Sequence, residues 1–245
     1  EMCIRDRRNL RLLIDNGARG IGDASLGTAN LIFLALKSLE LDRLVTDGER
    51  DHTFFVVEEP EAHLHPHIQR LVYRYFLGGA GDGEEDTPPL TTILTTHSPH
   101  IASVTPIRSI VLLRHDAGEE ATTAVSTATA PLTARDEADL QRYIDVSRGE
   151  IFFARGVILV EGDAERFLIP AFAEALDIPL DMLGITVCSV SGTNFTPYVK
   201  LLGPQGLNIP HVILTDRDPN GANPPLVRRR LINVLRLVEN GVNYT

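Results

Sequence analysis

The sequence predicts an α/β fold built on parallel strands. Runs of β-forming residues at 157–160, 185–190 and 212–215 are separated by longer helix-like runs, and strands that alternate with helices in this way pair in parallel. The first and last runs end in acidic clusters, at 161–165 and 216–218. Because ligands bind beyond the carboxyl ends of the strands in open α/β sheets, both clusters are expected at one edge of one sheet.

The other elements follow from apolar runs and turn residues. The run at 31–41 predicts a largely buried helix, and the run at 54–57 predicts a buried strand. Pro66 favours the start of a helix, and an acidic, Gly- and Pro-rich stretch at 78–89 predicts an exposed loop. The remaining expected elements are strands at 10–14 and 91–95, a hairpin at 110–113 and 121–127, and helices at 66–76, 136–146, 164–175 and 195–202.

Composition excludes several classes of protein. The chain has 245 residues, of which 43% are hydrophobic and 23% charged, as is typical of one large or two ordinary globular domains. No apolar run approaches the roughly 20 residues that cross a bilayer, and no signal peptide is evident. No membrane partner is therefore expected, and a cytoplasmic location is the default. Cys3 and Cys188 are too few for a disulfide framework or a thiolate zinc site.

The charge balance restricts how the chain can meet nucleic acid. A formal charge of -10 and a pI near 5.2 exclude a broad basic surface that coats nucleic acid. They do not exclude a nuclease, because a catalytic edge rich in carboxylates is acidic before its metals bind. The basic run at 228–230 is interpreted as a solvated helix face, since consecutive arginines point in different directions around a helix.

The acidic clusters predict a divalent-metal site. Glu161 ends a strand and Glu165 lies one helical turn further on, so both can face one site. Asp216 and Asp218 alternate about Arg217, so both can point to one side of an extended chain. Carboxylates gathered at one edge repel each other unless divalent cations neutralise them, and Mg²⁺ or Mn²⁺ suit such oxygen ligands. Exposed loop acids are the alternative.

A loop between the two clusters is a candidate phosphate site. The segment Ser-Val-Ser-Gly-Thr-Asn at 189–194 follows the middle strand and precedes a helix. Its backbone N–H groups and hydroxyls can hold a phosphate. A plain turn with a helix cap is the alternative.

The first half carries the pattern of a Walker B strand. Residues 53–57 are mostly apolar and lead into Glu58 and Glu59. In such a motif the first carboxylate, Glu58, holds Mg²⁺, and the second, Glu59, orients or deprotonates the attacking water. His97 follows the strand at 91–95, as the switch histidine of ABC-type ATPases does. A structural histidine is the alternative.

These motifs resemble a known family. Glu-Glu-Pro-Glu-Ala-His-Leu-His-Pro at 58–66, with Thr-Thr-His-Ser-Pro at 95–99, resembles the ATPase of the overcoming-lysogenization-defect (OLD) nucleases, and the second half resembles their Toprim domain. The resemblance covers most of residues 24–245. It implies the C-terminal half of an ABC-type ATPase lobe over residues 1–148, followed over residues 149–245 by a Toprim domain that is truncated at its C-terminus.

The resemblance also implies roles for individual residues. Ser25 and Gly27 occupy the position of a signature loop, which holds the γ-phosphate of ATP across a dimer; an ordinary helix N-cap is the alternative. Glu165 is implied to help bind a second metal. The implied core metal ligands are Glu161, Asp216 and Asp218, and the implied catalytic residues are these three with Glu59 and His97.

Two family features do not occur in the sequence. No Gly-x-x-x-x-Gly-Lys-Ser/Thr stretch is found, and without it the α- and β-phosphates of ATP have no cradle. ATP binding is therefore expected to need a segment that this chain lacks, and the chain alone is not expected to hydrolyse ATP. The family also uses a lysine from a later segment. Lys200, the only lysine of the second half, does not match that position.

The motifs together predict an ATP-regulated, divalent-metal-dependent DNA endonuclease that works as a homodimer, with anti-phage defence as one implied role. Phosphodiester hydrolysis would use two metals, one to generate the nucleophile from water and one to stabilise the leaving oxygen. The alternative is a non-cleaving ATPase regulator whose Toprim unit only binds metal or nucleic acid. A primase or topoisomerase fragment is a remoter alternative.

Overall fold

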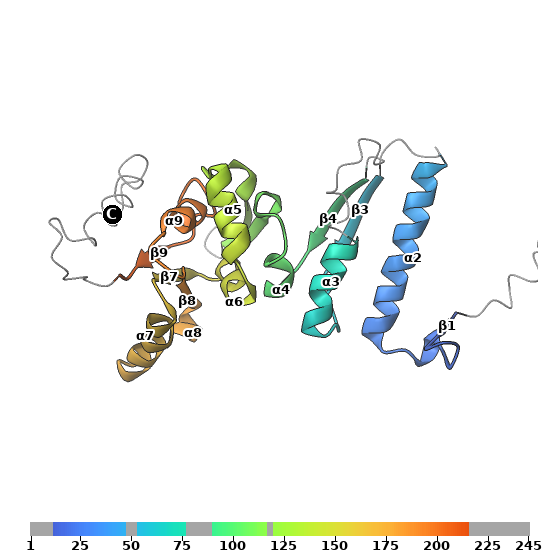
Figure 1. The fold of residues 1–245 in the computed structure, drawn as a ribbon, viewed down its shortest axis with the longest axis horizontal. Helices are drawn as coiled ribbons and strands as arrows, with labels where there is room; N and C mark the ends of the chain where they lie inside the picture. The colour runs from blue at the N-terminus through green and yellow to red at the C-terminus, as the bar shows by residue number, and fades with distance from the viewer. Residues whose placement is uncertain (1–11, 48–52, 77–89, 117–119, 216–245) are drawn as a thin grey trace, which may run out of the picture. The chain divides into compact units, whose positions relative to one another are not determined.

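A computed structural model describes residues 12–47, 53–76, 90–116 and 120–215 of the chain (Figure 1). The chain divides into two compact units, Glu1–Ser98 and Pro99–Thr245. The domain boundary expected between residues 148 and 149 stays a prediction. Within the described ranges no helix is both long and apolar enough to span a membrane.

The first unit contains a parallel strand pair with helices beside it (Figure 1). Strands β3 and β4 pair along their whole length, so that Glu58 lies opposite Thr95 and both strands end at the same edge. Helix α3 begins at Pro66, as predicted. The elements of this unit are β1 (Leu13–Ile14), β2 (Arg19–Gly20), a 3₁₀ turn (Ile21–Asp23), α2 (Leu26–Thr46), β3 (Thr53–Glu58), α3 (Pro66–Phe76) and β4 (Leu90–Thr95).

Two burial predictions for the first unit are wrong. The helix expected at 31–41 is part of α2, yet Phe33 and Leu39 are exposed while Leu34 is buried. Strand β3 likewise exposes Phe54 and buries only the face that packs on the helices. Both segments carry apolar runs, at 31–36 and 54–57, so their sequences indicate burial. In the described part of the chain, neighbours cover only one side of each.

The second unit is built around a three-stranded parallel sheet. The strand order is β8–β7–β9, with Val160 opposite Ser189 and Leu159 opposite Ile213. This confirms the predicted parallel sheet. The central elements are β7 (Gly156–Val160), α7 (Asp163–Ala175), α8 (Leu180–Leu183), β8 (Ile185–Ser189), α9 (Thr196–Leu202) and β9 (His211–Ile213).

Residues 99–152 pack onto this sheet rather than forming a core of their own. Ile107 and Leu140 belong to the same buried cluster as Leu159 and Leu201. The preceding elements are α4 (Pro99–Ala102), a 3₁₀ turn (Ile107–Ser109), the antiparallel strands β5 (Val111–Asp116) and β6 (Ala121–Ser126), a 3₁₀ turn (Thr127–Thr129), α5 (Ala134–Tyr143), α6 (Val146–Gly149) and a 3₁₀ turn (Glu150–Phe152).

The helix expected at 136–146 is divided into two helices. Thr133 and Asp136 form a capping box at the start of α5, which ends at Tyr143. Asp145 then caps a new helix, because its carboxylate accepts a hydrogen bond from the Arg148 backbone N–H at 2.9 Å. The break leaves Ile144, whose backbone is extended, between the two helices.

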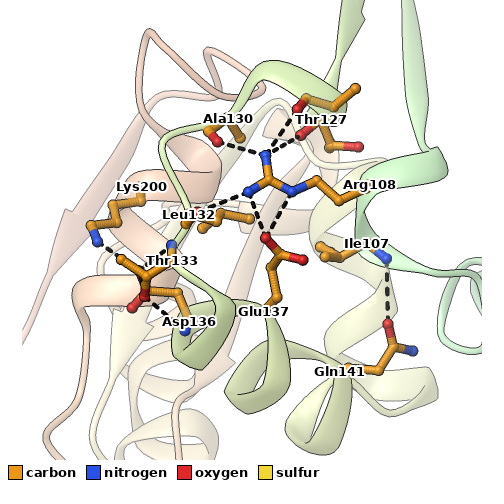
Figure 2. A network of polar contacts seen from close by, with 11 residues as sticks. Ile107, Arg108, Thr127, Ala130, Leu132, Thr133, Asp136, Glu137, Gln141 and Lys200 are labelled. Carbon is orange, nitrogen blue, oxygen red and sulfur yellow. Dashed lines mark hydrogen bonds and ion pairs between the residues drawn. The ribbon is translucent and has the colours of Figure 1, made fainter.

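A polar network fastens the first turns of α5 to the loops around it (Figure 2). The Arg108 guanidinium donates to the carbonyls of Ala130 at 2.7 Å and Leu132 at 2.8 Å, and it also pairs with Glu137. Beside it, Lys200 Nζ of α9 lies 2.6 Å from the Asp136 carboxylate. Both partners of this second pair are largely buried, so Lys200 joins α9 to α5.

Candidate functional site

The carboxyl ends of β7 and β9 meet at one edge of the sheet of the second unit. The Leu214 backbone N–H donates to the Leu159 carbonyl at 2.9 Å, which continues the strand pairing to the last described residues. The Thr215 hydroxyl then donates to Oε1 of Glu161. Asp216 and Asp218, the other two predicted ligands, lie outside the described residues.

Glu165 bends back toward the start of its own helix. Its Oε2 accepts a hydrogen bond from the Gly162 backbone N–H at 3.0 Å, which satisfies one of the donors that a helix start leaves unpaired. Glu165 therefore contacts the backbone of Gly162, the residue that follows Glu161. One of its carboxylate oxygens already has a structural role there.

The loop after β8 lies against the backbone of Glu161. The Gly192 N–H donates to the Glu161 carbonyl at 2.8 Å, and the Val190 N–H donates to Val160 at 2.9 Å. Ser191 has φ of 53° and Gly192 has φ of 145°, so the loop turns sharply, and the Gly192 conformation is one that side chains rarely adopt. The predicted phosphate loop is thereby brought to the edge that carries Glu161.

Arg148 contacts this loop and was not predicted from the sequence. Its Nε donates to the Ser189 carbonyl at 2.6 Å, and its Nη2 donates to the Ser191 hydroxyl. Its Nη1 donates to the Tyr143 carbonyl at 2.6 Å. Two of these partners lie 41 and 43 residues away along the chain, and no local pattern signals such a contact.

The oxygen atoms at this edge could serve as ligands of a hard divalent cation, because such cations prefer carboxylate and hydroxyl oxygens. Glu161, Glu165 and Thr215 supply those oxygens among the described residues. Within the described ranges no group of three or more His, Cys, Asp or Glu side chains is arranged to hold a metal.

Cys188 lies close to this edge, and its side chain is buried. It is a buried free cysteine of β8, and burial raises the pKa of its thiol to about 12. The thiol therefore stays protonated at neutral pH.

The first unit brings together the ends of β3 and β4. The Glu59 N–H donates to the Thr95 carbonyl at 3.0 Å, and Glu59 adopts a left-handed φ of 41°. Its Oε1 lies 3.3 Å from Nε2 of His97, and both side chains are more than half exposed, at 53% and 82%. Glu58, Glu59 and His97 thus lie at one accessible edge, while their roles as Walker B carboxylates and switch histidine stay predictions.

Glu61 is a second residue that sequence reasoning missed. Its Oε1 accepts a hydrogen bond from the Thr96 hydroxyl at 2.6 Å and another from the His97 N–H at 2.9 Å. These bonds hold the loop after β4 against the loop after β3. The signal available in the sequence was the position of Glu61, two residues after Glu59 within the motif.

Ser25 and Gly27 begin helix α2. The Ser25 hydroxyl accepts a hydrogen bond from the Thr28 N–H at 3.3 Å, so Ser25 is the N-cap that was the alternative interpretation. Gly27 is buried, and a Cβ built on it would lie 2.4 Å from the backbone carbonyl oxygen of His63. The start of α2 can therefore approach the loop after β3 only because residue 27 has no side chain.

Replacing Gly27 with alanine is expected to destabilise the first unit by about 1–3 kcal/mol, the usual cost of forcing extra atoms into a packed contact. In a helix, alanine is otherwise more favourable than glycine by about 1 kcal/mol. A loss of stability in Gly27→Ala would therefore be opposite in sign to the effect of helix propensity. Urea unfolding of both proteins measures the change. Gly22→Ala is the control, because its Cβ would meet nothing within 4 Å. Equal stability of Gly27→Ala and the unaltered chain would contradict the prediction.

Comparisons with known proteins agree with this geometry. Residues 152–218 match the Toprim domain of overcoming-lysogenization-defect-like proteins, and residues 6–102 match an AAA ATPase domain. The chain thus combines an ATPase segment with a Toprim segment. The combination confirms the resemblance to the OLD family that the motifs indicated.

Two of the similar proteins are named as nucleases. The OLD nuclease of Thermus scotoductus is 29% identical over 174 residues, which are 70% of this chain and 32% of that protein. The endonuclease GajA of Bacillus cereus is 25% identical over 76% of this chain and 28% of its own length. The chain therefore spans about a third of the length of these curated relatives.

Solved structures of OLD proteins also match part of the chain. The C-terminal region of the Xanthomonas campestris pv. campestris OLD protein is 79% identical over 39% of this chain and 42% of that chain, with a TM-score of 0.34. The C-terminal region of the Burkholderia pseudomallei OLD protein is 72% identical over 38% of this chain and 46% of that chain, with a TM-score of 0.34.

Proposed function

We propose that the chain is part of an ATP-regulated, divalent-metal-dependent DNA endonuclease. The observation that carries the proposal is the hydrogen bond from Thr215 to Glu161. Asp216 follows Thr215 directly in the sequence, and the proposal takes both acidic clusters to share one sheet edge. Relatives named as nucleases support the same reaction class. The proposed setting is the cytoplasm, and the proposed role, implied by the resemblance to the OLD family, is anti-phage defence.

In this proposal Glu161, Asp216 and Asp218 hold Mg²⁺ or Mn²⁺, and Glu165 assists with a second ion. Bound ions of this kind supply a nucleophile at neutral pH and neutralise charge that develops on the phosphate. The protein's own contribution is orientation. Thr215 fixes one carboxylate oxygen of Glu161, and the Gly192 N–H fixes its backbone.

The first unit would supply the regulation by ATP. Glu58 would hold the Mg²⁺ of the nucleotide, and Glu59 with His97 at 3.3 Å would orient the attacking water. Ser25 and Gly27, at the start of α2, would meet the nucleotide of a second copy, which makes the working form a homodimer. ATP binding also needs a phosphate cradle, and this sequence has no Gly-x-x-x-x-Gly-Lys-Ser/Thr stretch to supply one.

Nicking of supercoiled plasmid by the gene product that contains this chain tests the proposal. We expect relaxed circles with Mg²⁺ or Mn²⁺, none with EDTA, and none from Asp216→Ala or Asp218→Ala. Glu174→Ala is the matched control, because it removes an exposed carboxylate of α7 and should nick normally. Intact nicking by Asp216→Ala would refute the nuclease assignment. Metal binding without nicking by the unaltered protein would instead favour the non-cleaving ATPase regulator.

A further inference from the structure

The loop after β8 is held from two sides, and its two anchors differ in kind. On one side the Gly192 N–H donates to the Glu161 carbonyl. On the other side Arg148 donates to the Ser189 carbonyl and to the Ser191 hydroxyl. The first anchor is a contact between backbone atoms, which the positive φ of Gly192 allows. The second depends on the forked guanidinium of one side chain.

The Arg148 guanidinium uses its N–H groups for hydrogen bonds to this loop and to Tyr143. Its side chain is only 14% exposed, and Asp145 lies 3.7 Å from its Nη1. Its acceptors on Tyr143, Ser189 and Ser191 are reached by three different nitrogens. A lysine ammonium is a single point with a different reach, so it cannot serve the same three acceptors at once. Arg148 is therefore a clamp rather than a free cation for DNA.

The hydrogen bond from Arg148 determines whether the Ser191 hydroxyl can still donate a hydrogen bond. A hydroxyl has one hydrogen to donate and lone pairs to accept with. Because the Arg148 guanidinium donates to the Ser191 oxygen, the hydrogen of Ser191 is left for another acceptor. Ser191 itself is exposed, and Gly192 next to it touches the backbone of Glu161. An acceptor that approaches this loop from solvent can meet this donor.

We propose that Ser191 donates its hydroxyl hydrogen to a non-bridging oxygen of the DNA phosphodiester, and that Arg148 is the positioning residue that orients it. This inference rests on the proposed nuclease function and assigns its substrate contact. The acceptor chemistry fits, because phosphate oxygens receive many protein hydrogen bonds from serine hydroxyls. No bond forms or breaks at Ser191; the contact only binds substrate.

Steady-state nicking kinetics test this contact with Ser191→Ala, Arg148→Lys and the double variant. We expect each single change to raise KM for DNA about 10-fold, in line with a hydrogen bond to a charged group. The value of kcat should stay within about twofold, since lost uniform binding changes KM alone. The double variant should be no worse than the poorer single one, because both changes remove the same contact. Arg142→Lys, at an exposed arginine of α5, should leave KM unchanged.

The outcomes separate this inference from the proposed function. Unchanged KM in both single variants, or additive effects in the double variant, would overturn the Ser191 contact while leaving the nuclease assignment intact. Ser191→Ala keeps the bond from Arg148 to the Ser189 carbonyl, so it should remain folded, which thermal unfolding checks. If the unaltered protein does not nick, binding of a labelled DNA duplex in Ca²⁺ gives the same comparison. Equal Kd for the unaltered protein and Ser191→Ala would overturn the inference.

Discussion

Glu161→Gln is expected to slow metal-dependent nicking by about 100-fold or more. A bound metal supplies several kcal/mol of charge stabilisation to the reaction, and each 1.4 kcal/mol or so is worth about tenfold in rate. Glutamine has nearly the shape of glutamate and keeps an oxygen that can accept the hydrogen bond from Thr215. The substitution therefore removes the negative charge while leaving the local fold in place. Nicking rates measured over a range of Mg²⁺ concentrations test the prediction.

Two further variants make this test specific to the metal site. Glu165→Gln should have a smaller effect, because its amide oxygen can still accept from the Gly162 N–H and only the assisting ligand is weakened. Glu174→Gln, further along the same helix, should nick normally. A rate for Glu161→Gln equal to that of the unaltered protein at every Mg²⁺ concentration would contradict its role as a ligand.

The features that the sequence predicted well are those encoded by neighbouring residues. The parallel sheet follows from apolar runs of strand length separated by helices, and the start of α3 follows from Pro66. The contact of Glu161 with Thr215 at one edge of the sheet follows from strand direction alone. In each case the residues that cause the feature lie within a few positions of it, so the feature can be recognised from the sequence alone.

The features that were missed depend on partners far away in the chain. Arg148 meets Ser189 and Ser191 across more than 40 residues, and Glu61 meets His97 across 36. The sequence predicted that Phe54 and Phe33 are buried, but both are exposed. An apolar side chain can be buried, but its residue type does not tell which neighbour covers it. The break between α5 and α6 is different, since Asp145 is a helix-capping residue type and could have been recognised.

Lys200→Met is expected to destabilise the second unit by about 3 kcal/mol, because removing one partner leaves a buried charge uncompensated. Lys200 and Asp136 have only 16% and 11% of their side chains exposed, and their atoms lie 2.6 Å apart. Methionine preserves most of the aliphatic length of lysine, so the loss reports the charge. Lys37→Met is the matched control: its pair with Glu40 is about half exposed, and exposed pairs contribute about 0–1 kcal/mol. Urea unfolding measures both.

The pH dependence of this loss identifies its source. Burial alone would raise the pKa of Asp136, but hydrogen bonds from Lys200 and Thr133 outweigh it and hold the pKa below its ordinary value of 3.8. A carboxyl whose pKa is lowered by folding stabilises the protein above that ordinary value and loses the contribution as pH falls through the folded pKa. The stability gap between the unaltered chain and Lys200→Met should therefore be full at pH 7 and narrow below about pH 3.8. A gap that stays constant down to acid pH would mean that Lys200 acts through packing rather than through its charge. In the double variant Lys200→Met with Asp136→Asn, the loss should be smaller than the sum of the two single losses, because neither partner is then left charged and alone.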